Sequence, residues 1–305
     1  MNCVNFNFDT YKNETSILID VLFKLREALT GTQINKKELN WKPLSCDILF
    51  KFIMNAITLS NILNGSKFIT EILKKPNKLI FYDISSIFVL LRELLENYLT
   101  FNYLFIHAKS SKDIDLRVNL FKYKGLQRRQ NYEIIPENHQ TKITEKKEMD
   151  FLKKRIMGNP IKDNYVKIKN WVNFLENPNK NKLFNWKEMI ENSKLNSDYF
   201  VSFWALLSNY AHSEYVSIIQ IKDAYNNPDK SFLYESKKVY ESLLILLSLS
   251  IKDFVVLFSD LLSSQYDSLD ISIKNIIIYH CNQNSNFEKK INFIHEIYSK
   301  FNKDS

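Results

Sequence analysis

Residues 87–99 read IFVLLRELLENYL, and they are the clearest indication of the fold class. It belongs to a longer apolar segment, residues 79–106, whose length calls for a test as a membrane span. The charged residues within that segment are Asp83, Arg92, Glu93 and Glu96. A charge in the middle of a membrane span costs about 2.5–3.5 kcal/mol on insertion scales, so we interpret the segment as a long helix buried inside the protein. We expect this helix to begin at a cap on Asp83 or Ser85 and to end near His107.

Helical signals continue on both sides of this segment. Apolar residues recur at i+4 spacing from Ile17 to Leu29, and Pro43 stands where a first helical residue belongs. Helices are expected over residues 13–30, 44–63, 113–129, 143–157, 163–175, 196–212 (with Asn196 or Ser197 as the cap), 235–262, 271–281 and 287–301. The apolar run 216–221 is ambiguous, and no stretch alternates apolar and polar residues for long enough to demand a sheet. The sequence therefore predicts an all-α, multi-helix bundle.

The composition excludes several classes of protein. Apolar residues make up 45% of the chain and charged residues 25%, which is typical of a globular protein and excludes wholesale disorder. With 4 glycines in 305 residues, the chain lacks a glycine-rich phosphate loop and the fingerprint of a doubly wound nucleotide fold. Cys3, Cys46 and Cys281 are scattered, so we expect no disulfide framework, no metal site and no cofactor. The first residues do not have the pattern of a signal peptide, so we expect a cytoplasmic protein.

Positive charge is concentrated in one middle segment. Residues 109–194 hold 20 basic and 11 acidic residues, a net charge of +9. The rest of the chain holds 22 basic and 23 acidic residues, a net charge of −1. We therefore expect residues 109–194 to form a basic helical insertion or cap on a nearly neutral helical body, which residues 1–108 and 195–305 would form.

Four cations of this segment are candidates for binding nucleic acid. They are Lys122, Lys124, Arg128 and Arg129, and they stand among Tyr123 and Tyr132. Single-stranded nucleic acid needs this combination, because cations meet its phosphates and rings stack on its bases. Acidic residues interrupt the patch, at Glu145, Glu148 and Asp150. The alternative is therefore a solvated or partner-binding face.

Three further polar residues are candidates for chemistry. Arg92 and Glu96 stand at i and i+4 on an apolar helix, with the base before the acid, which is the less favourable order for a helix. Two interpretations stay open for this pair: a buried bridge that joins two helices, or an oriented cation that lines a pocket. His212 ends an expected helix beside Asn209. Its imidazole is either a general acid or base, or a hydrogen-bonded core histidine.

These motifs resemble those of a known group of proteins. The segments RELLE, residues 92–96, and LSNYAH, residues 207–212, are similar to those of an uncharacterised bacterial family of all-helical proteins that look like distant relatives of HEPN domains. The resemblance extends over residues 45–260 and implies a HEPN-like bundle. Active HEPN ribonucleases use an Arg and a His of one helix, without metal, on the RNA backbone, usually across a dimer. In this chain no His has an Arg four to six residues before it.

The resemblance implies an RNA-directed protein of a defence or toxin system. Under this hypothesis, His212 exchanges the proton of a ribose 2′-hydroxyl or leaving oxygen, Arg92 stabilises the phosphorane charge and Glu96 orients Arg92. Asn209 would join the RNA-binding residues. The expected partners are RNA and a second copy of the chain, with no membrane. The competing interpretation is a non-enzymatic helical protein-interaction module.

Overall fold

The computed structural model describes residues 8–30, 41–68, 79–81, 83–177, 185–212, 214–226 and 228–284. Its α-helices are α1 (Phe8–Thr30), α2 (Lys42–Ile62), α3 (Ile84–Phe101), α4 (Ser111–Gln130), α5 (Gln140–Met157), α6 (Trp171–Glu176), α7 (Trp186–Glu191), α8 (Ser197–Ala211), α9 (Tyr215–Asn226), α10 (Pro228–Leu257), α11 (Ser259–Asp267) and α12 (Ile271–Gln283). Two short strands, β1 (Ser66–Phe68) and β2 (Leu79–Phe81), pair antiparallel with Lys67 opposite Ile80. The predicted all-α bundle is confirmed, and this three-residue ladder is an addition to it. The expected helix 287–301 lies outside the described residues.

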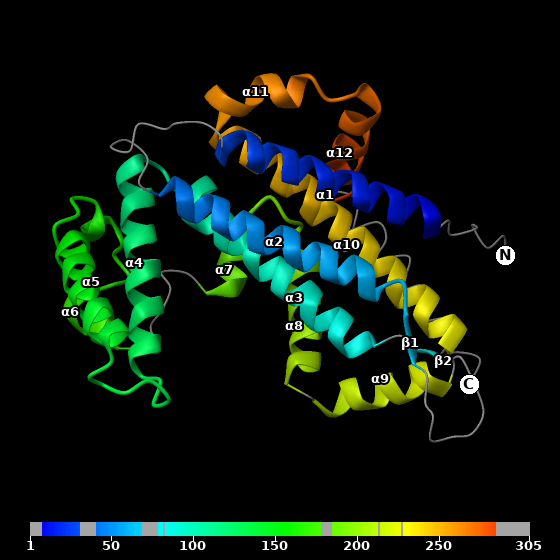
Figure 1. Ribbon diagram of the computed structural model, residues 1–305, viewed down its shortest axis with the longest axis horizontal. Coiled ribbons are helices and arrows are strands. Elements are labelled where there is room, and N and C mark those ends of the chain that lie inside the picture. The colour runs from blue at the N-terminus through cyan, green and yellow to red at the C-terminus, as the bar shows by residue number, and fades with distance from the viewer. Residues whose placement is uncertain are drawn as a thin grey trace.

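Four long helices form the body of the molecule. α1, α2, α3 and α10 run side by side, with α1 and α3 each packed against both α2 and α10 (Figure 1). α8 packs antiparallel against α3. Near the start of α3, the ring of Phe88 meets the ring of Tyr210 edge to face, with 4.5 Å between the ring centroids. Two turns later on α3, Glu96 accepts a hydrogen bond from Trp204, which lies earlier on α8. The largest fully buried side chains are Tyr98, Tyr240, Phe88, Phe200 and Phe254. The polar residues of α3 are therefore held by a continuous apolar core.

The central helix begins and ends where the sequence predicts. Asp83 caps α3, because its carboxylate accepts a hydrogen bond of 3.0 Å from the backbone N–H of Ser86. After Phe101 the chain continues as a π-helix, Asn102–Ile106, and ends at His107. α4 begins at Ser111 and runs in another direction from α3 (Figure 1), so the π-helix is the last helical turn before this change. Such a turn is frequent at functional sites.

Two predicted helices are wrong in part. The predicted helix 163–175 is reduced to a 3₁₀ turn, Lys162–Asn164, and to α6, because the Asn170 side chain accepts from the N–H of Asn173 and starts a new helix there. The predicted helix 235–262 is two helices. The backbone of Phe258, with φ −122° and ψ 39°, leaves the helical region and separates α10 from α11.

Helices α4, α5 and α6 form a separate layer, the cap, beside one end of the body (Figure 1). α4 packs along α5, and the cap has its own small core. The buried residues of this core are Leu116, Leu120, Tyr123, Leu152, Ile156, Trp171, Phe174 and Leu175. The expected insertion ran over residues 109–194, but α7 buries Met189 and Ile190 in the core of the body. The layer with its own core therefore ends before α7.

α2 has the length and hydropathy of a membrane span, and no other helix of the described residues does. In this structure it packs between α1 and α3, and it buries Leu49, Phe52 and Ile53 among others in the core. This composition is also that of a core helix in a bundle.

Candidate functional site

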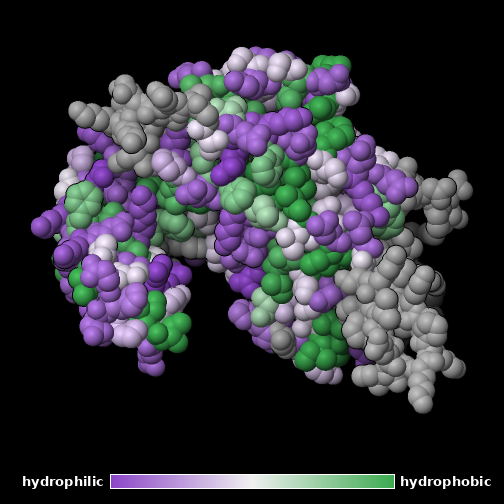
Figure 2. All heavy atoms as spheres, in the orientation of Figure 1, coloured by the Kyte–Doolittle hydropathy of each residue, from purple (hydrophilic) through white to green (hydrophobic). Residues whose placement is uncertain are grey.

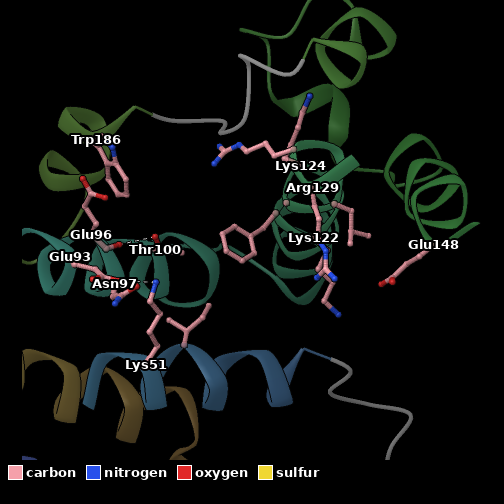
Figure 3. Close-up of a pocket in the computed structure, with 15 residues that line it drawn as sticks. Lys51, Glu93, Glu96, Asn97, Thr100, Lys122, Lys124, Arg129, Glu148 and Trp186 are labelled. Carbon is pink, nitrogen blue, oxygen red and sulfur yellow. Dashed lines mark hydrogen bonds and ion pairs between the residues drawn. The ribbon is translucent and has the colours of Figure 1, made fainter. Parts of the chain in front are cut away.

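A cleft of about 890 Å³ lies between the cap and the body. Its body wall comes from α2, α3 and α7, and its cap wall comes from α4 and α5 (Figure 3). The surface of the molecule is hollowed between these two parts (Figure 2). The cleft brings together residues that the sequence analysis selected separately, because Glu96 lines one wall and Lys122, Arg128 and Arg129 line the other. We take it as the candidate functional site.

The cap wall is centred on a glycine in the middle of α4. Phe121, Lys122, Arg128 and Arg129 stand at i−4, i−3, i+3 and i+4 from Gly125, so all four share its face of the helix. A Cβ placed on Gly125 meets no atom within 4 Å. Glycine inside a helix costs about 1 kcal/mol relative to alanine, and no steric contact requires it here. The bare backbone leaves room for a ligand between the surrounding side chains.

The cations of the cap wall differ in how they are paired. Arg129 Nε lies 3.0 Å from Glu145 of α5, so this charge is matched within the cap. Lys122 and Arg128 have no ion pair with any described residue. The charged residues that line the cleft are five basic ones, Lys51, Lys122, Lys124, Arg128 and Arg129, and three acidic ones, Glu93, Glu96 and Glu148. This balance favours an anionic ligand.

The structure buries Lys124, which the sequence analysis predicts to bind nucleic acid. Its side chain is turned into the cap, and the residue is 2% exposed. Its Nζ donates to the carbonyl oxygens of Phe174, Leu175 and Asn177 at 2.7–2.9 Å. These are the unpaired carbonyls at the C-terminal end of α6, so Lys124 caps that helix. Burial, and then the charge of Arg128, lower the pKa of Lys124 to about 8.

The body wall presents one polar face of α3. Glu93, Glu96, Asn97 and Thr100 follow the i, i+3, i+4, i+7 spacing and all line the cleft (Figure 3). Glu93 is matched by Lys51 of α2, whose Nζ lies 2.9 Å away. A ligand in the cleft therefore has hydrogen-bonding groups on one side and, on the other, two cations that no described residue pairs.

Arg92 and Glu96 do form the predicted pair, and a tryptophan completes it. Arg92 Nε donates to Glu96 Oε1 at 2.9 Å, and Trp204 Nε1 of α8 donates to the same oxygen at 3.1 Å. The guanidinium also lies over the Trp204 ring, 5.4 Å from its centroid. The group that lines the cleft is Glu96, not Arg92. The pair joins α3 to α8, as the first of the two open interpretations expects, and it presents an acid to the cleft.

The structure does not bring His212 to Arg92. His212 is exposed at the C-terminal end of α8, where its backbone N–H donates to the carbonyl of Ser208. It lies eight residues beyond Trp204, a rise of about 12 Å along the helix, while Arg92 lies against Trp204. Asn209 is partly buried on the same far part of α8. Neither residue lines the cleft.

A second polar cluster, which the sequence analysis missed, fixes the cap to the body. Arg117 of α4 donates to both carboxylate oxygens of Asp113 at 2.9 and 3.1 Å, and to the carbonyl oxygen of Tyr103 in the π-helix at 2.5 Å. The hydroxyl of Tyr165 donates to Asp113, and His107 Nδ1 lies 3.4 Å from Arg117. Only the i, i+4 spacing of Asp113 and Arg117 in the sequence indicates this cluster.

The pKa shifts of this junction follow from burial and from its charges. Burial raises the pKa of Asp113, but hydrogen bonds from Tyr165 and the Lys109 N–H, and the charge of Arg117, outweigh burial and hold it below its usual value. Burial and then the same guanidinium lower the pKa of His107. The junction therefore consists of the Asp113–Arg117 ion pair beside the neutral imidazole of His107. We interpret this cluster as structural.

Comparison with known proteins identifies no relative of established function. No curated protein and no solved structure matches the chain. A family model does match part of the chain, residues 81–228, and this part includes α3, the cap and α8, and so most of both walls of the cleft. Over that segment the chain matches the model of a family of unknown function (DUF5677), which agrees with the expected likeness to an uncharacterised helical family.

Proposed function

We propose that the cleft between the cap and the body binds single-stranded RNA. The observation that carries this proposal is the face of α4, where Lys122 and Arg128, which form no ion pair with any described residue, flank the bare backbone of Gly125. A cation without a protein partner favours phosphate binding, because no ion pair within the protein has to be broken first. The open backbone lets the strand come close to both of them.

Aromatic rings in the same cleft favour a single strand over a duplex. Phe121 is 37% exposed on the cap wall, and Trp186 lines the body wall. Stacking of a base on such a ring contributes about 1–3 kcal/mol and needs bases that are not paired with each other. A volume of about 890 Å³ is in the range of sites for small ligands, so the cleft accommodates a few nucleotides of a strand.

The geometry favours binding without cleavage. The enzymatic hypothesis needs Arg92 and His212 at one phosphate, but Arg92 of α3 lies against Trp204 in the middle of α8, whereas His212 stands at the C-terminal end of α8. RNA is therefore expected to stay intact with the wild-type protein in the presence of a chelator. Cleavage that is lost in His212→Ala, with the fold retained, would restore the ribonuclease hypothesis.

The decisive experiment fills the cleft without disturbing the fold. Gly125→Leu projects a side chain into open space, whereas Gly125→Ala adds one methyl group and is the matched control. Fluorescence anisotropy with labelled single-stranded RNA should show at least ten-fold weaker binding for Gly125→Leu and unchanged binding for Gly125→Ala. Both should retain the melting temperature of the wild type or exceed it. Full affinity in Gly125→Leu would place the RNA elsewhere.

The salt dependence tests the two cations separately. Each phosphate contact to a single strand contributes about 0.7 to the slope of log K against log salt, so Lys122→Gln and Arg128→Gln should each reduce the slope by about that amount. Lys147→Gln, an exposed cation of α5 outside the cleft, should leave it unchanged. If the wild type binds no RNA even at low salt, the protein-interaction module becomes the better hypothesis.

A further inference from the structure

The carboxylate of Glu96 is fixed by one of its two oxygens. Arg92 Nε and Trp204 Nε1 both donate to Oε1, at 2.9 and 3.1 Å. No hydrogen bond from the described part of the chain reaches Oε2. Because the two donors come from different helices, α3 and α8, they set the plane of the carboxylate as well as its position. The side chain is 26% exposed and lines the cleft.

Glu96 differs in this respect from the other acid of the same wall. Glu93 is bound by Lys51, and both side chains are largely exposed, at 41% and 59%. Surface pairs of this kind hold their geometry weakly. Arg92 is 18% exposed and lies against the Trp204 ring, so the pair that holds Glu96 is more rigid. Glu96 is the preorganised hydrogen-bond acceptor of the cleft.

The opposing walls give a bound strand one orientation. Phosphates go to Lys122 and Arg128 on α4, so the base edges point to α3 across the cleft (Figure 3). An acceptor fixed at that place binds an N–H donor and rejects a second acceptor, since two facing lone pairs leave buried polar groups unpaired. Cytosine has an amino donor at its 4-position, and uracil has a carbonyl oxygen there.

We infer that Glu96 reads the bases of the RNA and selects cytosine, or another base with an exocyclic amino group, against uracil. This inference rests on the proposed RNA binding in the cleft. One well-placed contact to a base discriminates by roughly 5- to 150-fold. Arg92 and Trp204 are positioning residues in this arrangement, because they act on the base only through Glu96.

The test compares short oligocytidylate with oligouridylate of equal length, because the two pyrimidines have the same size. Fluorescence anisotropy near pH 7.5 should show at least five-fold tighter binding of oligocytidylate by the wild type. In Glu96→Gln, the two donors bind the amide oxygen, so the amide NH₂ takes the place of Oε2. The variant should therefore lose or reverse the preference. Glu93→Gln makes the same chemical change on the same wall and should keep it.

A second variant tests the positioning role. Trp204→Phe removes one hydrogen-bond donor to Glu96 and should reduce the preference for oligocytidylate. It should not change the slope of log K against log salt, because this slope depends on the phosphate contacts of the α4 cations. Equal binding of both oligonucleotides by the wild type, or an unchanged preference in a folded Glu96→Gln protein, would overturn the inference while RNA binding in the cleft stands. Failure of the wild type to bind either oligonucleotide would instead overturn the proposed function.

Discussion

Arg117→Met should reduce the free energy of unfolding by about 3–5 kcal/mol, because it leaves a buried carboxylate without its cation. The side chains of Arg117 and Asp113 are 2% and 5% exposed. The guanidinium supplies two hydrogen bonds to Asp113 and one to the carbonyl oxygen of Tyr103. Methionine fills much of the space of the arginine stem, so the expected loss is one of charge and hydrogen bonds more than of packing.

The double variant separates the pair from its parts. Asp113→Leu alone leaves Arg117 buried and unpaired, and should cost a similar amount. Asp113→Leu with Arg117→Met leaves neither charge behind, so its cost should be at least about 2 kcal/mol less than the sum of the two single costs. Urea unfolding followed by circular dichroism measures all three proteins against the wild type. Lys147→Met, an exposed change on α5, is the control and should stay within about 0.5 kcal/mol of the wild type.

Two results would contradict a stabilising role of the Asp113–Arg117 ion pair. A loss below about 1 kcal/mol in Arg117→Met would mean that Asp113 is protonated or reached by water once the base is gone. If the loss of unfolding free energy in the double variant equals the sum of the losses in the two single variants, Arg117 acts on the body through Tyr103 and not through its pair with Asp113. Either result would remove the ion pair as the reason why α4 leaves the π-helix in a fixed direction.

Three further predictions concern single residues. Lys124→Met should cost about 2–3 kcal/mol, since hydrogen bonds to a charged group are lost at three carbonyls; urea unfolding measures this loss, and faster hydrogen exchange in α6 should accompany it. Gly125→Ala should stabilise the protein by about 0.5–1 kcal/mol, and a lower melting temperature would contradict the open space around this glycine. Burial and Arg117 lower the pKa of His107 below its usual 6.5, so the unfolded chain binds a proton that the folded protein does not. Stability should therefore fall as the pH drops through 6.5 towards the lowered pKa. His107→Gln should flatten this part of a plot of unfolding free energy against pH.

The fold could be predicted from the sequence where a capping side chain identifies the start of a helix. Asp83 is one of two predicted caps and Asn196 one of two others, and in the structure each of these side chains accepts a hydrogen bond from a backbone N–H at the start of its helix. The break at Phe258 has no glycine or proline beside it, so the apolar pattern continues through it and predicts one helix. The strands β1 and β2 have three residues each, too few to show an alternating pattern. These features depend on tertiary packing, which overrides local propensity.

The charge of the cap predicted an anion-binding face but not its place. Many cations of this segment are matched within the cap itself, as Lys142 is by Glu137 and Arg129 is by Glu145. Lys124 is sequestered by the carbonyls of α6. What remains towards the cleft is Lys122 and Arg128. A count of charges along the sequence cannot separate these two groups, because the pairing depends on which helices lie side by side.

The role of the Arg92–Glu96 pair depends on a residue that is distant in the sequence. Within one helix, the base-before-acid order is the less favourable one, so helix stability does not explain it. Trp204, 108 positions later than Glu96, donates to the same oxygen that Arg92 binds. With both donors on Oε1, the acid is the residue that is oriented and the base is the residue that orients it. The sequence-based hypothesis has Glu96 orient Arg92, because the sequence alone does not show that α8 covers the arginine and that the glutamate lines the cleft.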